Sequence, residues 1–151
     1  MSEHIAFLKE AIALSESAVQ HGNQPFGALL VKDDKVVMTA ENTAVTSNNV
    51  TEHAELNLVR AALMTYEPDE LIDCTLYSSN EPCVMCAGAI YFSGIRRVVY
   101  GCSEKRLREI MQVDGMAISG RDVLEQSLSH QIEVVGPVLE DEAAVIHLRY
   151  W

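Results

Sequence analysis

The chain has 151 residues, 48% of them hydrophobic and 22% charged, and its formal net charge is −11. We expect residues 1–151 to form a single domain, because this length suits one buried core. So much negative charge repels phosphate backbones and argues against a nucleic-acid partner. No apolar run reaches 18 residues and no signal peptide is visible at the N-terminus. We therefore expect a cytoplasmic protein without a membrane partner.

The N-terminal half predicts two helices with two strands between them. Residues 4–21 form a helix in this prediction, which Gly22 and Pro25 would end. Apolar residues recur along one face of it: Ile5, Leu8, Ile12 and Val19. Strands are expected at 26–31 and 36–40 with a turn between them, and residues 43–50 read as a loop. A second helix spans about 52–65, with these inward positions: Ala54, Leu58, Ala61 and Ala62.

The C-terminal half continues this alternation of helices and strands. Strands are predicted at 74–78, 97–101 and 131–135. Helices are predicted at 83–92, 104–112, 121–127 and 140–150. The alternation predicts an α/β fold, a three-layer α/β/α sandwich around one five-stranded sheet.

Four cysteines stand at positions 74, 83, 86 and 102. A disulfide framework is not expected in a chain without a secretion signal. Cys74 and Cys102 lie in strand-like runs, which favours buried, inert thiols. Cys83 and Cys86 form a C-x-x-C pair, and such a pair serves either metal binding or thiol redox chemistry.

The sequence pairs this C-x-x-C motif with a second short motif, His53-Ala54-Glu55. Both motifs open a predicted helix, where the positive end of the helix favours thiolates. His53, Cys83 and Cys86 would make a zinc site with three protein ligands and one Zn²⁺ per subunit. The fourth position is left for a water, and Glu55 is placed to move its protons. H-x-E followed by P-C-x-x-C is the signature of zinc deaminases, which favours metal over redox chemistry.

These motifs resemble the cytidine deaminase-like superfamily, in particular its guanine deaminase and tRNA adenosine deaminase branch. The resemblance covers roughly residues 3–115 and rests on Pro25-Phe26-Gly27-Ala28, Asn42, His53-Ala54-Glu55, residues 71–77 and residues 81–90. It implies a five-stranded mixed sheet between helices and a homodimer or larger assembly. It also implies that a C-terminal segment with an aromatic residue closes the pocket, sometimes that of a neighbouring subunit.

The resemblance also implies a set of substrate contacts. Phe26 would line the base pocket, Asn42 would hydrogen-bond the ring, and the Ala54 amide would contact the base. Asp114 would lie near the reacting amine, where a carboxylate favours a guanine-like ring, and Trp151 could stack on the base. The leading hypothesis from the sequence is therefore deamination of guanine to xanthine with release of ammonia.

Other functions stay open at this point. The alternatives are deamination of cytosine, a pterin, an aminotriazine or guanosine, or of adenosine in tRNA. The last requires a basic surface to hold the anticodon loop, which a chain of net charge −11 largely lacks. A catalytically silent, zinc-stabilised subunit is disfavoured, because Glu55 is present.

Overall fold

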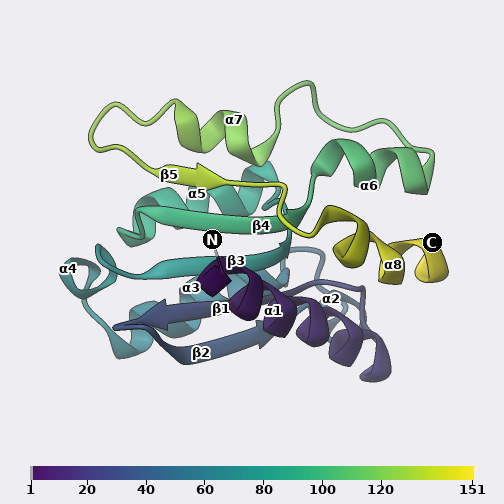
Figure 1. The fold of residues 1–151 in the computed structure, drawn as a ribbon, viewed down its shortest axis with the longest axis horizontal. Coiled ribbons are helices and arrows are strands. Elements are labelled where there is room, and N and C mark those ends of the chain that lie inside the picture. Colours follow the sequence, from purple (N-terminus) through teal and green to yellow (C-terminus); the bar gives the residue numbers. More distant parts are fainter. Residues whose placement is uncertain (1) are drawn as a thin grey trace.

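Five strands form one sheet in the order β2-β1-β3-β4-β5 (Figure 1). The computed structural model describes residues 2–151. Strand β1 pairs antiparallel with β2 and β3, whereas β3, β4 and β5 are parallel. The sheet is therefore mixed, as the resemblance implied. The strands span Gly27–Lys32 (β1), Lys35–Glu41 (β2), Thr75–Asn80 (β3), Arg97–Cys102 (β4) and Glu133–Val135 (β5).

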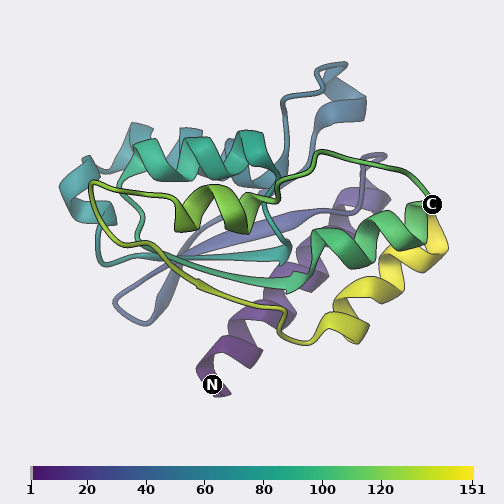
Figure 2. The same ribbon diagram turned by 90° about the horizontal axis from the view of Figure 1, so that it is seen from above.

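Helices cover both faces of this sheet (Figure 2). One face carries α1 (Ser2–Gln20) and α8 (Glu140–Tyr150), and the other carries α3 (Ala54–Thr65), α5 (Val84–Ser93) and α7 (Gly120–Glu125). Helix α6 (Glu104–Met111) follows β4 and packs against α8. Two short helices complete the fold, α2 (Ala44–Ser47) and α4 (Pro68–Leu71). The structure confirms the three-layer sandwich.

Strand β1 is almost wholly buried because helices lie on both of its sides. Leu29 packs with Leu8 of α1, whereas the next residue, Leu30, packs with Leu58 of α3. Gly27 begins β1 where α1 approaches most closely, since a Cβ there would lie 2.5 Å from Leu14 Cβ. This close packing fixes the start of β1, and with it the residue that precedes it, Phe26. Strand β2, at the edge of the sheet, alternates between exposed and half-buried residues instead.

The buried cysteines follow the prediction as well. Cys74 and Cys102 are buried free thiols beside β3 and in β4. Burial raises the pKa of both thiols, that of Cys102 to about 12, which keeps them protonated and unreactive. Within residues 2–151, no helix has the length and apolarity required to cross a bilayer.

Element boundaries differ from the predictions by one or two residues at most ends. The helix predicted at 52–65 begins at Ala54, because the backbone of its N-cap, His53, is extended. Of its expected inward positions, Ala61 is only half-buried, while Val59, which was not predicted, is buried. Helices α2 and α4 lie in segments without a predicted helix, since four residues are too few for a helical periodicity.

Candidate active site

Three predicted metal ligands meet between the first turns of two helices. His53 is the N-cap of α3, and Cys83 is the N-cap of α5, whose first turn contains Cys86. The ligand atoms of these residues all lie within 4.8 Å of one another. His53 Nδ1 is 3.5 Å from Cys83 Sγ and 3.7 Å from Cys86 Sγ. The topology thus joins motifs that are 30 residues apart in the sequence.

This donor set fits a zinc ion in its chemistry and its spacing. Zinc–sulfur bonds of about 2.3 Å and zinc–nitrogen bonds of about 2.0 Å at tetrahedral angles put the two ligand atoms about 3.5 Å apart. The two nitrogen–sulfur distances agree with that value. Two sulfurs and one imidazole make three protein ligands, the number typical of catalytic rather than structural zinc sites. The cluster of His53, Cys83 and Cys86 therefore fits zinc ligation, and these are the residues that would hold the ion.

The electrostatics of the cluster favour a cation ligand. A hydrogen bond from the Cys86 side chain, helped by His53, holds the pKa of the Cys83 thiol at about 4 despite partial burial. The same hydrogen bond, together with burial, raises the pKa of the Cys86 thiol. The hydrogen bond with Cys83 raises the pKa of His53. One thiolate is thus already favoured at neutral pH, which suits metal binding.

Glu55 lies one residue inside α3 and is 4% exposed. Burial, and secondarily the negative charge of Cys83, raises the pKa of its carboxyl group to about 7, while His53 acts in the opposite direction. Glu55, His53 and Cys83 all line one cavity. A carboxyl group that changes protonation near neutral pH beside a metal site can serve as an acid and a base.

This zinc-site cavity has a volume of about 250 Å³ and combines aromatic, apolar and polar walls. Its size lies below the range of cavities that hold drug-sized ligands, so it suits a compact ring. Phe26 and Trp151, two predicted contacts, line it. Besides these and the residues of the two motifs, the lining consists of Gln24, Asn80, Glu81, Glu104, Leu107 and Met111.

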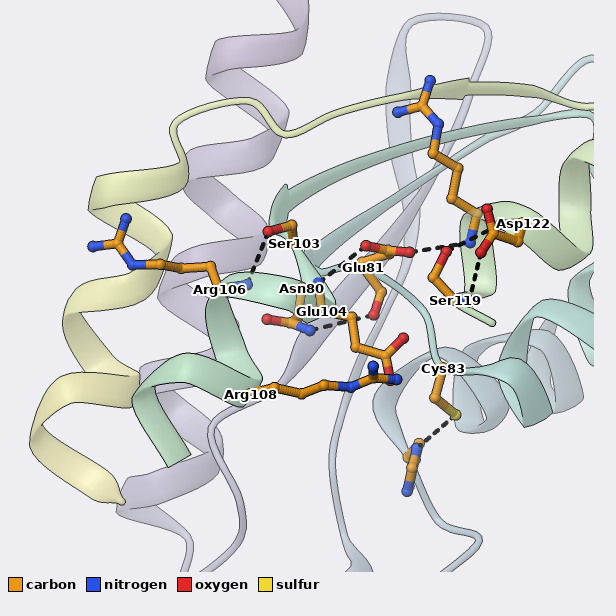
Figure 3. A network of polar contacts seen from close by, with 11 residues as sticks. Asn80, Glu81, Cys83, Ser103, Glu104, Arg106, Arg108, Ser119 and Asp122 are labelled. Atoms are coloured by element: carbon orange, nitrogen blue, oxygen red, sulfur yellow. Dashed lines mark hydrogen bonds and ion pairs between the residues drawn. The ribbon is translucent and has the colours of Figure 1, made fainter. Parts of the chain in front are cut away.

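Glu81 ties the loop before Cys83 to the helices around the cavity (Figure 3). Its Oε1 accepts a hydrogen bond from the backbone N–H of Glu104, 3.0 Å away, and its Oε2 accepts one from Arg121 N–H, 3.1 Å away. Gly120, at the start of α7, lies so near Pro82 that a Cβ would collide with the Pro82 carbonyl oxygen. One buried carboxylate thus joins the C-x-x-C loop to α6 and α7.

Two other predicted contacts do not line the zinc-site cavity. Asn42 is fully buried, and its Oδ1 accepts a hydrogen bond from Ala44 N–H, 3.0 Å away. Its Nδ2 faces Gln24 Oε1 at 3.5 Å, so Asn42 contacts the cavity wall from behind. Ala54 is buried at the start of α3, between the ligand His53 and Glu55. Direct contact of Asn42 or Ala54 with a substrate stays a prediction.

Asp114 is exposed and lies outside the zinc-site cavity. It lines a separate, larger cavity of about 790 Å³ between α6 and the segment that leads to α7. Glu81 and Glu104 line both cavities, and Arg108 Nη2 donates a hydrogen bond to Glu104 Oε1 at 2.9 Å (Figure 3). These side chains form the wall between the cavities. The structure thus does not bring Asp114 to the zinc-site cavity, and its role beside the reacting amine stays a prediction.

Asn80 and Glu104 are two polar residues of the cavity that the sequence-based prediction missed. Asn80 Nδ2 donates a hydrogen bond to the Glu81 carbonyl at 3.3 Å, whereas its Oδ1 is buried without a partner. Glu104 Oε2 is also buried without a partner, and burial raises the pKa of this carboxyl group although Arg108 opposes the shift. The signal in the sequence was the amide of Asn80 at the end of a buried strand, directly before Glu81-Pro82.

Comparison with known proteins agrees with this geometry. Residues 1–102 match the family model of the cytidine and deoxycytidylate deaminase zinc-binding region. The chain is 45% identical over 152 residues to a probable cytosine deaminase of Schizosaccharomyces pombe, covering 97% of this chain and 91% of that protein. It is 43% identical over 98 residues to the guanine deaminase of Bacillus subtilis, covering 64% of this chain and 63% of that protein.

A solved structure gives the same result for the fold. A chain from work on A-to-I editing by tRNA:A34 deaminases superposes with a TM-score of 0.75 at 33% identity, covering 94% of this chain and 99% of that one. The matched residues, 1–102, contain His53, Glu55, Cys83 and Cys86. The chain therefore belongs to the cytidine and deoxycytidylate deaminase zinc-binding family and is a zinc-dependent deaminase.

Proposed function

We propose that this chain catalyses the hydrolytic deamination of a free nucleobase with release of ammonia. The observation that carries the proposal is the buried carboxyl group of Glu55, which lines one cavity with two residues of the metal-binding cluster, His53 and Cys83. The cavity of about 250 Å³ has room for a single base.

Glu55 is the proton carrier in this mechanism. When bound, zinc supplies a Lewis acid that lowers the pKa of a water. A Glu55 carboxylate oxygen takes a proton from this water and passes it to the ring nitrogen next to the amine-bearing carbon. As the water oxygen bonds to that carbon, the same Glu55 oxygen would carry the remaining hydroxyl proton to the departing amine, so that a C=O bond forms while the C–N bond breaks and ammonia leaves. Because Glu55 is 4% exposed, bulk water does not compete for these protons.

The polar walls of the cavity favour a ring that carries its own N–H groups. Asn80 Oδ1 and Glu104 Oε2 are buried acceptors without a protein donor. A substrate N–H would satisfy these acceptors, and buried polar groups are rarely left unpaired. Free bases have such an N–H at the position where nucleosides carry the sugar. The rings of Phe26 and Trp151 then contact the faces or edges of the base.

Cytosine is the first candidate substrate, and guanine is the second. The 45% identity over nearly the whole chain to a probable cytosine deaminase favours cytosine. Guanine is supported by the 43% identity to a guanine deaminase and by Phe26, which follows Pro25 as that resemblance requires. Asp114 was one of the grounds on which the sequence favoured guanine, and that residue does not line the zinc-site cavity.

An ammonia-release screen of the zinc-loaded chain tests the proposal. The compounds are cytosine, guanine, adenine, cytidine, guanosine, an aminotriazine, a pterin and tRNA. We expect turnover of a free base and much slower turnover of the matching nucleoside. Turnover of tRNA alone, or of nucleosides in preference to bases, would contradict the proposed substrate class while leaving the zinc chemistry intact.

The proposal includes a homodimer in the cytoplasm. All four cysteines are free thiols, which suits a reducing compartment. Phe92 on α5 and Leu128 after α7 are 81% and 100% exposed, which supports a contact between chains on this side of the sheet. Light scattering is expected to give twice the mass of one chain, and a monomer at all concentrations would contradict the homodimer.

A further inference from the structure

His147 is a histidine of α8 that lies wholly inside the protein and contacts two residues of the zinc-site cavity. It has no exposed surface. Its Nδ1 accepts a hydrogen bond from the indole Nε1–H of Trp151, 3.1 Å away. Its ring also packs on Phe26, with ring centroids 5.2 Å apart and an interplanar angle of 52°. Trp151 and Phe26 both line the cavity, whereas His147 does not.

The hydrogen bond fixes which nitrogen of His147 carries the proton. An indole N–H only donates, so Nδ1 must be the acceptor and the proton of the neutral ring is on Nε2. Nε2 is buried and has no hydrogen-bond partner among residues 2–151. An apolar side chain would fill the same space without an unpaired N–H. What the imidazole adds over such a side chain is the acceptor for Trp151.

We propose that His147 is a positioning residue that fixes the Trp151 indole and the Phe26 ring as aromatic walls of the zinc-site cavity. Trp151 is 41% exposed and lies at the rim of that cavity, so its indole needs a fixed partner to hold one orientation. The partner, His147, is four residues earlier on the same helix. One chain thus closes its own site, and the indole is already in place before a flat ring binds.

The single tryptophan allows a test that needs no turnover. Trp151 is the only tryptophan in the chain, so a ¹H–¹⁵N spectrum has one indole cross-peak. In the zinc-loaded chain, His147→Phe keeps a buried ring and removes the acceptor, while His147→Asn keeps an acceptor oxygen close to the position of Nδ1. In His147→Phe we expect the indole proton to shift upfield and to exchange faster with water. In His147→Asn we expect the chemical shift and the exchange rate to return largely to those of the original chain.

A matched control is available at His130. This histidine also stacks on an aromatic ring, Tyr91, with centroids 5.4 Å apart, and it lines a cavity that Trp151 does not line. His130→Phe is expected to leave the indole cross-peak in place. An indole shift and exchange rate in His147→Phe equal to those of the original chain would overturn the proposal. So would a His147→Asn variant that resembles His147→Phe.

Kinetics then separates positioning from a merely structural role. This arm rests on the proposed function, because it uses the base that the ammonia screen identifies. Loss of one neutral hydrogen bond predicts a KM about fivefold to tenfold higher in His147→Phe, with kcat within about twofold. Trp151→Phe is expected to do the same, and the double variant to be no worse than either single one. Additive effects, or a fall in kcat with unchanged KM, would overturn the proposal.

The two arms fail separately. If no base is turned over, the proposed function is wrong, and the indole spectrum still decides whether His147 holds Trp151. If His147→Phe does not fold, the spectrum of His147→Asn and the KM of Trp151→Phe decide. A shifted, fast-exchanging indole signal in His147→Asn, or an unchanged KM in Trp151→Phe, would overturn the proposal. A retained indole signal together with a raised KM would support it.

Discussion

At the scale of single residues, the zinc-site cavity holds polar groups that the protein leaves without partners. Most buried polar atoms in proteins are hydrogen-bonded, and leaving one unpaired costs about 1–3 kcal/mol. Asn80 Oδ1 and Glu104 Oε2 are both buried without a hydrogen-bond partner. Both residues line the cavity. This combination is expected where a ligand completes the hydrogen bonds, and it makes the two residues candidates for recognition of the base.

Asn80→Leu tests this role, because it removes the acceptor and keeps a similar side-chain volume. We expect KM for the free base to rise about tenfold and the preference for base over nucleoside to shrink. Ser78→Ala is the matched control: Ser78 Oγ is likewise buried and unpaired on β3, but Ser78 does not line the cavity. Equal KM values for the Asn80 variant and the original chain would remove Asn80 from substrate recognition.

At the scale of elements, the zinc site depends on how three helices are held at the ends of β3 and β4. The loop before α5 is fixed by Glu81, whose carboxylate accepts backbone N–H groups from the first turns of α6 and α7. Glu81 N–H also donates to the Cys102 carbonyl at 2.7 Å. A single buried side chain therefore sets the position of Cys83 relative to both helices.

Replacing Glu81 should weaken the whole arrangement. Glu81→Gln keeps one acceptor and loses the other together with the charge, so we expect the free energy of unfolding to fall by about 2–3 kcal/mol. Urea denaturation of the zinc-loaded chain measures it. Glu125→Gln is the control, since Glu125 pairs with Arg121 at a half-exposed position, where about 0–1 kcal/mol is expected. Equal losses in both variants would contradict the structural role of Glu81.

Most elements and the metal ligands could be predicted from the sequence because their signals are local. His53, Cys83 and Cys86 carry a motif whose spacing defines its chemistry, and the structure brings them together. The residues that line the cavity were harder to predict, because they depend on which loops pack against the zinc site in the folded chain. Asp114 matched the resemblance by spacing, yet the segment after α6 lies outside the wall formed by Glu104. Asn80 lies just beyond the strand predicted at 74–78, and its place directly before Glu81-Pro82 was too weak a signal to show that its amide meets a cavity.

At the scale of the whole molecule, one buried histidine makes the stability depend on pH. Burial lowers the pKa of His147 to about 4, against 6.5 for an exposed histidine. The unfolded chain therefore binds a proton at a higher pH than the folded chain does. The stability from the neutral ring is fully present above pH 6.5 and is lost as pH falls from 6.5 to about 4.

Chemical denaturation at several pH values measures this dependence. Between pH 7 and pH 4 we expect the contribution of His147 to fall by about 3 kcal/mol. His147→Phe removes the titrating group, so the difference in unfolding free energy between this variant and the original chain should change by that amount over the same range. Parallel pH profiles for the two proteins would show that His147 is not buried in its neutral form.

The central claim is that the cluster of His53, Cys83 and Cys86 is catalytic and that Glu55 moves the protons. Glu55→Gln tests it most directly, because the amide fills the same space but cannot carry a proton. With one zinc per chain confirmed for both proteins, we measure ammonia release from the base found in the screen. We expect the variant to retain its zinc and to lose about 10²- to 10⁴-fold in kcat. Full turnover by zinc-loaded Glu55→Gln would contradict the claim.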